Sequence, residues 1–238
     1  MKLYFECTNG ISGDMSVGAL LDLGADKEKL KHAFSSLGLG REFNYEISEV
    51  KVNSIKAVDF NVKILNHHHT HRHLKDIEEI IDKADMSQNA KNLSKKIFKI
   101  VANAEAKVHS TPLEEVHFHE VGAIDSIADI IGFSVLYDDL NPEKTYISTI
   151  QEGQGTVMCA HGRMNVPAPA VCEILSTYKI PFKITNIEGE MVTPTGCAIV
   201  AALYNNEQLK EEIVIEKVGY GAGKRPYPNP VLRVMQIQ

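Results

Sequence analysis

The stretch "KLYFECTNGISGDMSVGALLDLG", residues 2–24, decides how the fold begins. "KLYFEC" is typical of a strand and "GISGDM" of a turn. The apolar spacing of "SVGALLDLG" predicts a helix that ends at Gly24, a natural residue after a helix C-terminus. The next predicted elements are a helix over 27–37 and two paired strands over 43–50 and 57–65 that turn near Asn53. The chain therefore opens as β-α-α-β-β.

The middle of the chain is predicted to be helical. Residues 74–84 and 87–109 have apolar side chains at i, i+3 and i+4, which is typical of amphipathic helices. A short extended piece follows and becomes a helix after Gly122. Further on, the pattern predicts strands over 145–153, 181–185, 211–223 and 231–238 and helices over 166–178 and 193–205.

This alternation predicts a mixed α/β (α+β) protein of two lobes, with mixed β-sheets flanked by helices and a helical middle segment. We expect an N-terminal β-α-α-β-β lobe over residues 1–66. A histidine-rich loop and helical segment then covers residues 67–140, and a C-terminal α/β lobe covers residues 141–238.

Composition narrows the class of protein. The 238 residues are 44% hydrophobic and 24% charged, which is ordinary for a globular chain with a real core. A net charge of −6 argues against nucleic-acid binding and mildly favours cations. No apolar run approaches the roughly 20 residues of a membrane helix, and the N-terminus has no signal-peptide pattern. The four cysteines are scattered without a CxxC pair, so we expect reduced thiols and a cytoplasmic protein.

The most conspicuous segment is "NHHHTHRH", residues 66–73, which contains His67, His68, His69, His71 and His73. Imidazole binds borderline divalent metals well. If the following helix begins early, histidines four apart form chelating pairs. If the segment is a loop, capture and delivery of metal are favoured over a rigid site. A solvated loop with adventitious metal affinity is the third interpretation.

A second group lies in "EVHFHEVGAIDSIADIIG", residues 115–132. If "VHFH" is extended, His117 and His119 share a face, with Glu120 beside them. Asp125 and Asp129 are four apart and share one helix face. Two imidazoles with carboxylates suit a divalent metal, and His161 in "CAHGRM" is a further candidate ligand. The plainer alternative is that the aspartates cap the helix or face water.

Four glycine turns offer backbone N–H groups to an anion: "GISGD", "EGQGTV", "TPTG" and "GYGAGKR". None is a Walker A or GxGxxG motif, and each can equally be ordinary turn chemistry. Neither a GxSxG elbow nor an HExxH signature occurs. The candidate anion-binding residues are Ser12, Gly13, Thr193, Thr195, Gly196, Lys224 and Arg225.

Six segments occur in one order: "GISGDM", the histidine-rich loop, "EVHFHEVGAIDSIADIIG", "AHGRMNVPAPA", "EGEMVTPTGCA" and "VGYGAG". Together they closely resemble the nickel insertion protein family of lactate racemase maturation. The resemblance implies a nickel chelatase of the lyase class. Its substrate is pyridinium-3,5-bisthiocarboxylic acid mononucleotide, and its product is the nickel-pincer cofactor of lactate racemase. It also implies dependence on CTP with Mn²⁺ or Mg²⁺. CTP belongs to a C-terminal portion of the family, and this chain resembles the N-terminal portion alone.

On this resemblance the loop histidines collect Ni²⁺, which His117, His119 and the nearby carboxylates then position. The glycine turns, with Lys224 or Arg225, hold the nucleotide phosphate. We expect the catalytic side chains among Asp14, Glu120 and Asp125. The expected partners are the substrate nucleotide, nickel, the C-terminal portion and further copies of the chain, without nucleic acid or membrane.

Two other functions remain open. In the first, the chain is a non-catalytic nickel or zinc store and only changes the free metal concentration. Alternatively, His117, His119, Asp125 and Asp129 form a metal-dependent phosphohydrolase, which would need no partner.

Overall fold

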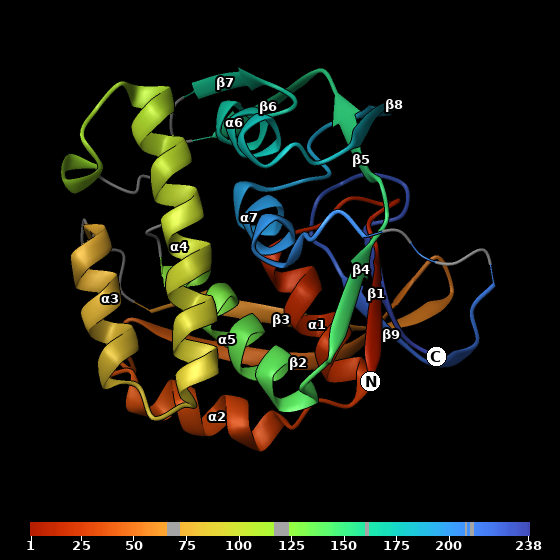
Figure 1. Cartoon of the computed structure of the whole chain (residues 1–238), viewed down its shortest axis with the longest axis horizontal. Coiled ribbons are helices and arrows are strands. Elements are labelled where there is room, and N and C mark those ends of the chain that lie inside the picture. The colour runs from red at the N-terminus through yellow and green to blue at the C-terminus, as the bar shows by residue number, and fades with distance from the viewer. Residues whose placement is uncertain (66–71, 117–123, 160–161, 208, 210–211) are drawn as a thin grey trace.

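The computed structural model describes residues 1–65, 72–116, 124–159, 162–207, 209 and 212–238 (Figure 1). In chain order the first half contains β1 (Lys2–Glu6), α1 (Gly13–Leu23), α2 (Lys27–Ser36), β2 (Phe43–Val52), β3 (Ile55–Ile64), α3 (Leu74–Lys83), α4 (Gln88–His109), a short 3₁₀ turn (Leu113–Glu115) and α5 (Ile124–Leu140). The second half contains β4 (Lys144–Ile147), β5 (Ile150–Gln154), β6 (Thr156–Cys159), β7 (Gly162–Asn165), α6 (Pro169–Tyr178), β8 (Phe182–Glu188), α7 (Pro194–Leu203), β9 (Ile215–Ala222) and β10 (Val231–Ile237).

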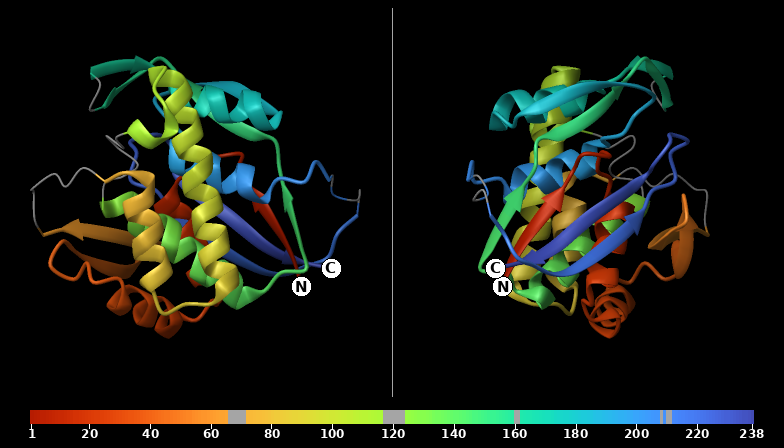
Figure 2. Two further views of the ribbon diagram at one scale, coloured as in Figure 1. Left: turned by 60° about the vertical axis from the view of Figure 1, so that its left-hand side comes forward. Right: turned by 90° about the vertical axis from the view of Figure 1, so that its right-hand side faces the viewer.

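The main sheet has six strands in the order β2-β3-β9-β10-β1-β4. β1 pairs with β10 antiparallel and with β4 parallel, while β3 meets β9 in parallel through Val58 and Gly221. The sheet therefore joins the first strands of the chain to the last. Two smaller pairs, parallel β5-β8 and antiparallel β6-β7, lie apart from it beside α6 (Figure 2).

Helix α1 packs directly on the main sheet, against β3, β9 and β10. Leu3 and Phe5 on β1 alternate with more exposed neighbours, so one face of that strand enters the core. A Cβ atom at Gly221 on β9 would lie 1.8 Å from the carbonyl oxygen of Met15, so only glycine lets α1 approach this closely. α1 ends at Gly24 with φ of 107°, as the sequence predicts.

A layer of helices covers α1 and joins the main sheet to the smaller strand pairs. α5 packs on α1 and α2, and the long helix α4 packs on α5 at one end and on α6 and α7 further along (Figure 1). Phe98 on α4 and Phe133 on α5 are fully buried in this layer. This arrangement holds the N-terminal ends of α1, α5 and α7 near one another. Among the described residues, no helix combines the length and apolarity needed to cross a bilayer.

The α/β class predicted from sequence is confirmed. The single strand predicted over 145–153 is wrong, because the chain leaves the main sheet after Ile147 and β5 pairs with β8 instead. The hairpin β6–β7 was not predicted. The division at residues 66 and 140 stays a prediction, although the first and third segments share the main sheet.

Candidate functional site

A cavity of about 640 Å³ opens where the first turns of α1 and α7 meet α5 and the hairpin β6–β7. Sequence-predicted residues line much of it: Ser12, Gly13, Asp14, Asp125, Asp129, Thr193, Thr195, Lys224 and Arg225. These residues come from four separate parts of the chain. The fold therefore brings the predicted anion-binding turns and the predicted carboxylate pair into one cleft.

Two helix N-termini face this cleft because the segments before them are hydrogen-bonded side by side. The N–H of Ile11 donates to the carbonyl of Met191 at 2.9 Å, and the N–H of Thr193 donates to the carbonyl of Ile11 at 3.1 Å. Gly196 does not line the cavity but permits this contact, since a Cβ there would lie 2.2 Å from the Ile11 carbonyl oxygen. Two helix dipoles thus present their positive ends to the same space, which favours a bound anion.

The threonine and serine side chains at these helix starts are partly engaged. Thr193 is the N-cap of α7, and its hydroxyl accepts the N–H of Gly196 at 3.1 Å. The hydroxyl of Ser12 donates to Asp14 Oδ1, which also accepts the N–H of Met15 at 2.9 Å. Ser12 is the N-cap residue of α1, and its side chain makes no capping hydrogen bond to the helix backbone.

Three carboxylates gather at the α1–α5 side of the cleft. Asp125 and Asp129 lie one turn apart on α5, as predicted, and Asp14 faces them from α1. Asp129 is recessed in the wall, where desolvation raises its pKa well above the ordinary value, and the charges of Asp14 and Asp125 raise it further. Desolvation also raises the pKa of Asp125. Gly13 makes room for this group, because a Cβ there would lie 2.4 Å from Asp129 Oδ2.

Both candidate phosphate-binding cations are paired with carboxylates. Lys224 Nζ lies 3.2 Å from Asp14 Oδ2 and 3.7 Å from Asp59 Oδ1, and it donates to the carbonyl of Phe60 at 2.7 Å. Arg225 contacts Glu190 at 2.6 Å, and the Glu190 side chain is only 5% exposed. An incoming phosphate would share these cations with their carboxylate partners.

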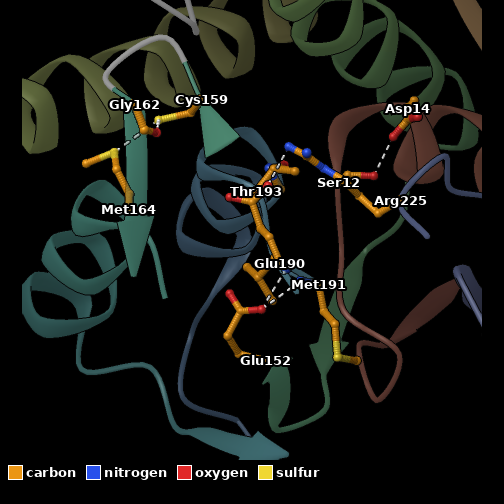
Figure 3. Close-up of polar contacts among 12 residues, drawn as sticks. Ser12, Asp14, Glu152, Cys159, Gly162, Met164, Glu190, Met191, Thr193 and Arg225 are labelled. Atoms are coloured by element: carbon orange, nitrogen blue, oxygen red, sulfur yellow. Dashed lines mark hydrogen bonds and ion pairs between the residues drawn. The ribbon is translucent and has the colours of Figure 1, made fainter. Parts of the chain in front are cut away.

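Sequence reasoning missed the sulfur atoms on the opposite wall. Met158, Cys159 and Met164 line the cleft from the hairpin β6–β7, and Met15 and Met191 add two more thioethers. The Sγ of Cys159 lies 3.1 Å from the Sδ of Met164 (Figure 3). Each strand has only four residues, and "TVMC" does not alternate between polar and apolar residues, so no periodic signal marked the hairpin.

Glu152 was also missed, because "QEGQG" reads as a polar turn. Its side chain is buried, and Oε1 accepts the N–H groups of Gly153, Met191 and Val192 at 2.8, 2.7 and 3.2 Å (Figure 3). Oε2 has no hydrogen-bond partner within the described part of the chain. Desolvation raises the pKa of Glu152 to about 7. Glu152 thereby ties β5 to the segment that carries Glu190 and Thr193 into the cleft.

The histidines do not contribute to the described part of the cleft. His73 is the N-cap residue of α3, which begins at Leu74, and its backbone N–H donates to Asp76 Oδ2 at 2.8 Å. The other predicted ligands and acid–base groups lie outside the described residues: His67, His68, His69, His71, His117, His119, Glu120 and His161. Within the described ranges, no three His, Cys, Asp or Glu side chains converge closely enough to hold a metal ion. The predicted metal site stays a prediction.

The fold and the cleft define an α/β protein in which two helix N-termini, a carboxylate group and a sulfur-bearing wall surround one cavity. The model of the nickel insertion protein family matches residues 3–238, and the chain belongs to that family. The resemblance drawn from the sequence motifs is thereby confirmed.

Curated relatives support the same assignment. The pyridinium-3,5-bisthiocarboxylic acid mononucleotide nickel insertion protein of Acetivibrio thermocellus is 46% identical over 231 residues, which are 94% of this chain and 56% of the relative. The protein of the same name from Alkaliphilus metalliredigens is 45% identical over 256 residues, covering 100% of this chain and 60% of the relative. The chain therefore spans less than two thirds of the length of these relatives. No solved structure is significantly similar.

Proposed function

We propose that this chain provides the nickel-handling and nucleotide-holding part of a nickel chelatase of the lyase class. Its substrate is pyridinium-3,5-bisthiocarboxylic acid mononucleotide, and its product is the nickel-pincer cofactor of lactate racemase. The names of the relatives support the nickel and the substrate. The observation that carries the proposal is the cleft at which the N-termini of α1 and α7 meet carboxylates and sulfurs.

The mononucleotide phosphate would bind at the two helix starts. Ser12, Gly13 and Thr195 line the cavity at these helix starts, and the hydroxyls of Ser12 and Thr195 would contribute donors to the anion. Lys224 and Arg225 would supply positive charge at the rim of the site. Neither cation needs to move far, because both already border the cavity.

Nickel would enter as the second substrate. The five histidines of residues 67–73 would collect it, and His117, His119, Asp125, Asp129 and His161 would position it. Asp14, Glu120 and Asp125 are the proposed acid–base groups. Desolvation raises the pKa of Asp125 above its ordinary value, and an arriving cation would favour loss of its proton.

CTP with Mn²⁺ or Mg²⁺ would act through the further portion of the family, which would work together with this chain in the cytoplasm as a homo-oligomer. No described group in the cleft is assigned to CTP. The carboxylates of the cleft wall are hard oxygen donors, of the type that Mn²⁺ and Mg²⁺ prefer, but no three of those that the structure describes lie close enough together to hold one ion.

Turnover tests the proposal. The chain would be mixed with the C-terminal portion of the Acetivibrio thermocellus relative, CTP, Mn²⁺, Ni²⁺ and the metal-free nucleotide, and the nickel-containing product would be detected by mass spectrometry. Product that requires this chain supports the proposal. A lower free nickel concentration without product would instead identify a nickel or zinc store. Hydrolysis of a generic phosphoester with Mn²⁺ alone would identify a phosphohydrolase.

A further inference from the structure

The hairpin β6–β7 brings a thiol and a thioether together on one wall of the cleft. Cys159 pairs with Gly162 in the hairpin register, and Val157 pairs with Met164. Cys159 and Met164 are therefore diagonal neighbours on one face of the hairpin. Their sulfur atoms lie 3.1 Å apart, and both residues border the cavity.

Cys159 is distinct among the four cysteines, all of which the structure describes. Cys7 and Cys197 are fully buried, and burial raises the pKa of the Cys7 thiol to about 12 and that of Cys197 higher still. Cys172 is exposed on α6 and does not border the cavity. Cys159 is thus the cysteine whose sulfur a ligand in the cleft can reach.

The sulfur spacing fits one coordination geometry better than another. With metal–sulfur bonds of about 2.3 Å, two sulfurs 3.1 Å apart subtend an angle of about 85° at a shared metal ion. That angle is close to the cis angle of about 90° in the square-planar sites typical of Ni(II) and Cu(II). A tetrahedral zinc site would need sulfurs about 3.8 Å apart.

We propose that Cys159 and Met164 form a two-sulfur chelating site for Ni²⁺ in the wall of the cleft. Binding forms one nickel–thiolate bond and one nickel–thioether bond, and the thiol proton of Cys159 is released to solvent. Nickel stays Ni(II), so neither an oxidant nor a reductant is needed. The thiol also contacts the carbonyl of Gly162 at 3.4 Å, and this contact gives way when the proton leaves.

Two protein ligands leave half of a square plane open, which suits transfer better than storage. Resting on the proposed function, we assign one of the open positions to a thiocarboxylate sulfur of the nucleotide. The last transfer of the ion would then be from soft sulfur donors to soft sulfur donors. In Figure 3 Asp14 lies on the far side of Thr193 and Ser12 from Cys159 and Met164.

Nickel alone tests the site, without nucleotide or CTP. The reduced protein would be titrated with Ni²⁺ until every site, including the histidine-rich segment, is saturated. Imidazole and carboxylate ligands give no thiolate-to-nickel charge-transfer band in the near ultraviolet, so that band reports Cys159. We expect the band in the natural chain and its loss in Cys159→Ser. Met164→Leu should keep a shifted band and weaken nickel binding by about tenfold or more.

Matched controls lie close by. Cys172→Ser removes an exposed thiol, and Met158→Leu removes the neighbouring thioether on the same hairpin; both should keep the band unchanged. X-ray absorption at the nickel edge gives a second measurement, with two sulfur scatterers in the natural chain and one in Met164→Leu. No band at saturating nickel, or a band that survives Cys159→Ser, would overturn the proposal. A normal band together with failed insertion would overturn the proposed function alone.

Discussion

Replacement of Glu152 by glutamine tests whether a buried, protonated carboxyl group supports the cleft. The side chain is 1% exposed, and its Oε1 holds three backbone N–H groups. Desolvation raises its pKa from 4.5 to about 7. Glutamine keeps the accepting oxygen but cannot ionise. Since one pKa unit corresponds to about 1.4 kcal/mol, ionisation of Glu152 costs the folded state about 3 kcal/mol.

The sign follows from the direction of the pKa shift. A carboxyl group with a raised pKa in the folded state contributes its full stability below the unfolded value of 4.5, and that contribution is lost as the pH rises through about 7. The free energy of unfolding of the natural chain should therefore fall, relative to Glu152→Gln, by about 3 kcal/mol between about pH 4 and about pH 8. The pKa values of Cys172, Cys197 and Tyr227 are raised, so these groups stay protonated over this range in both proteins. The charge of Glu190 contributes to the raised pKa of Glu152 itself.

Urea unfolding at several pH values measures this difference directly. Glu46→Gln serves as the control, because Lys63 lowers the pKa of the exposed Glu46 and keeps it ionised across the whole range. Its difference from the natural chain should not change with pH. If the difference for Glu152→Gln is equally constant, Glu152 titrates normally and the reasoning fails.

Three further outcomes are expected. Gly13→Ala places a Cβ 2.4 Å from Asp129 Oδ2, so urea unfolding should show a loss of about 1–3 kcal/mol, and an unchanged midpoint would contradict the close packing. Asp129→Asn removes a carboxyl group with a raised pKa, so it should stabilise the protein more at pH 8 than at pH 5; equal melting temperature changes would refute this. Lys224→Ala should weaken phosphate binding, measured by calorimetry, by a factor of a few. Lys56→Ala is the control and should not weaken it, because Lys56 pairs with Glu49 and neither residue lines the cleft. Equal losses of affinity in the two variants would show that Lys224 is not part of the anion site.

The sequence predicted well whatever depends on local periodicity. The helices that became α1, α2, α4 and α5 show their apolar spacing within one segment, and the β2–β3 hairpin shows both strands and its turn. The Asp125–Asp129 pair was found for the same reason, since a spacing of four residues fixes a shared helix face.

Long-range pairing could not be predicted in this way. Nothing local indicates that β1 lies between β4 and β10, or that residue 11 is bridged to residue 192. That bridge places the two glycine turns, "GISGD" and "TPTG", side by side, so that two helix N-termini face one site. The burial of Glu152 depends on the same long-range contact, because the N–H groups it accepts belong mainly to the distant segment at Met191.

The charges in the cleft couple the binding of a cation to the binding of an anion. Lys224 is held by Asp14 and Asp59, so both its positive charge and the Asp14 carboxylate are occupied before any ligand arrives. A divalent cation near Asp14 competes with Lys224 for that carboxylate, and the released ammonium group becomes available to a phosphate. By linkage, a bound phosphate that draws Lys224 away raises the cation affinity by the same factor. The proposed nickel insertion requires this property, because metal and nucleotide would have to occupy the cleft together.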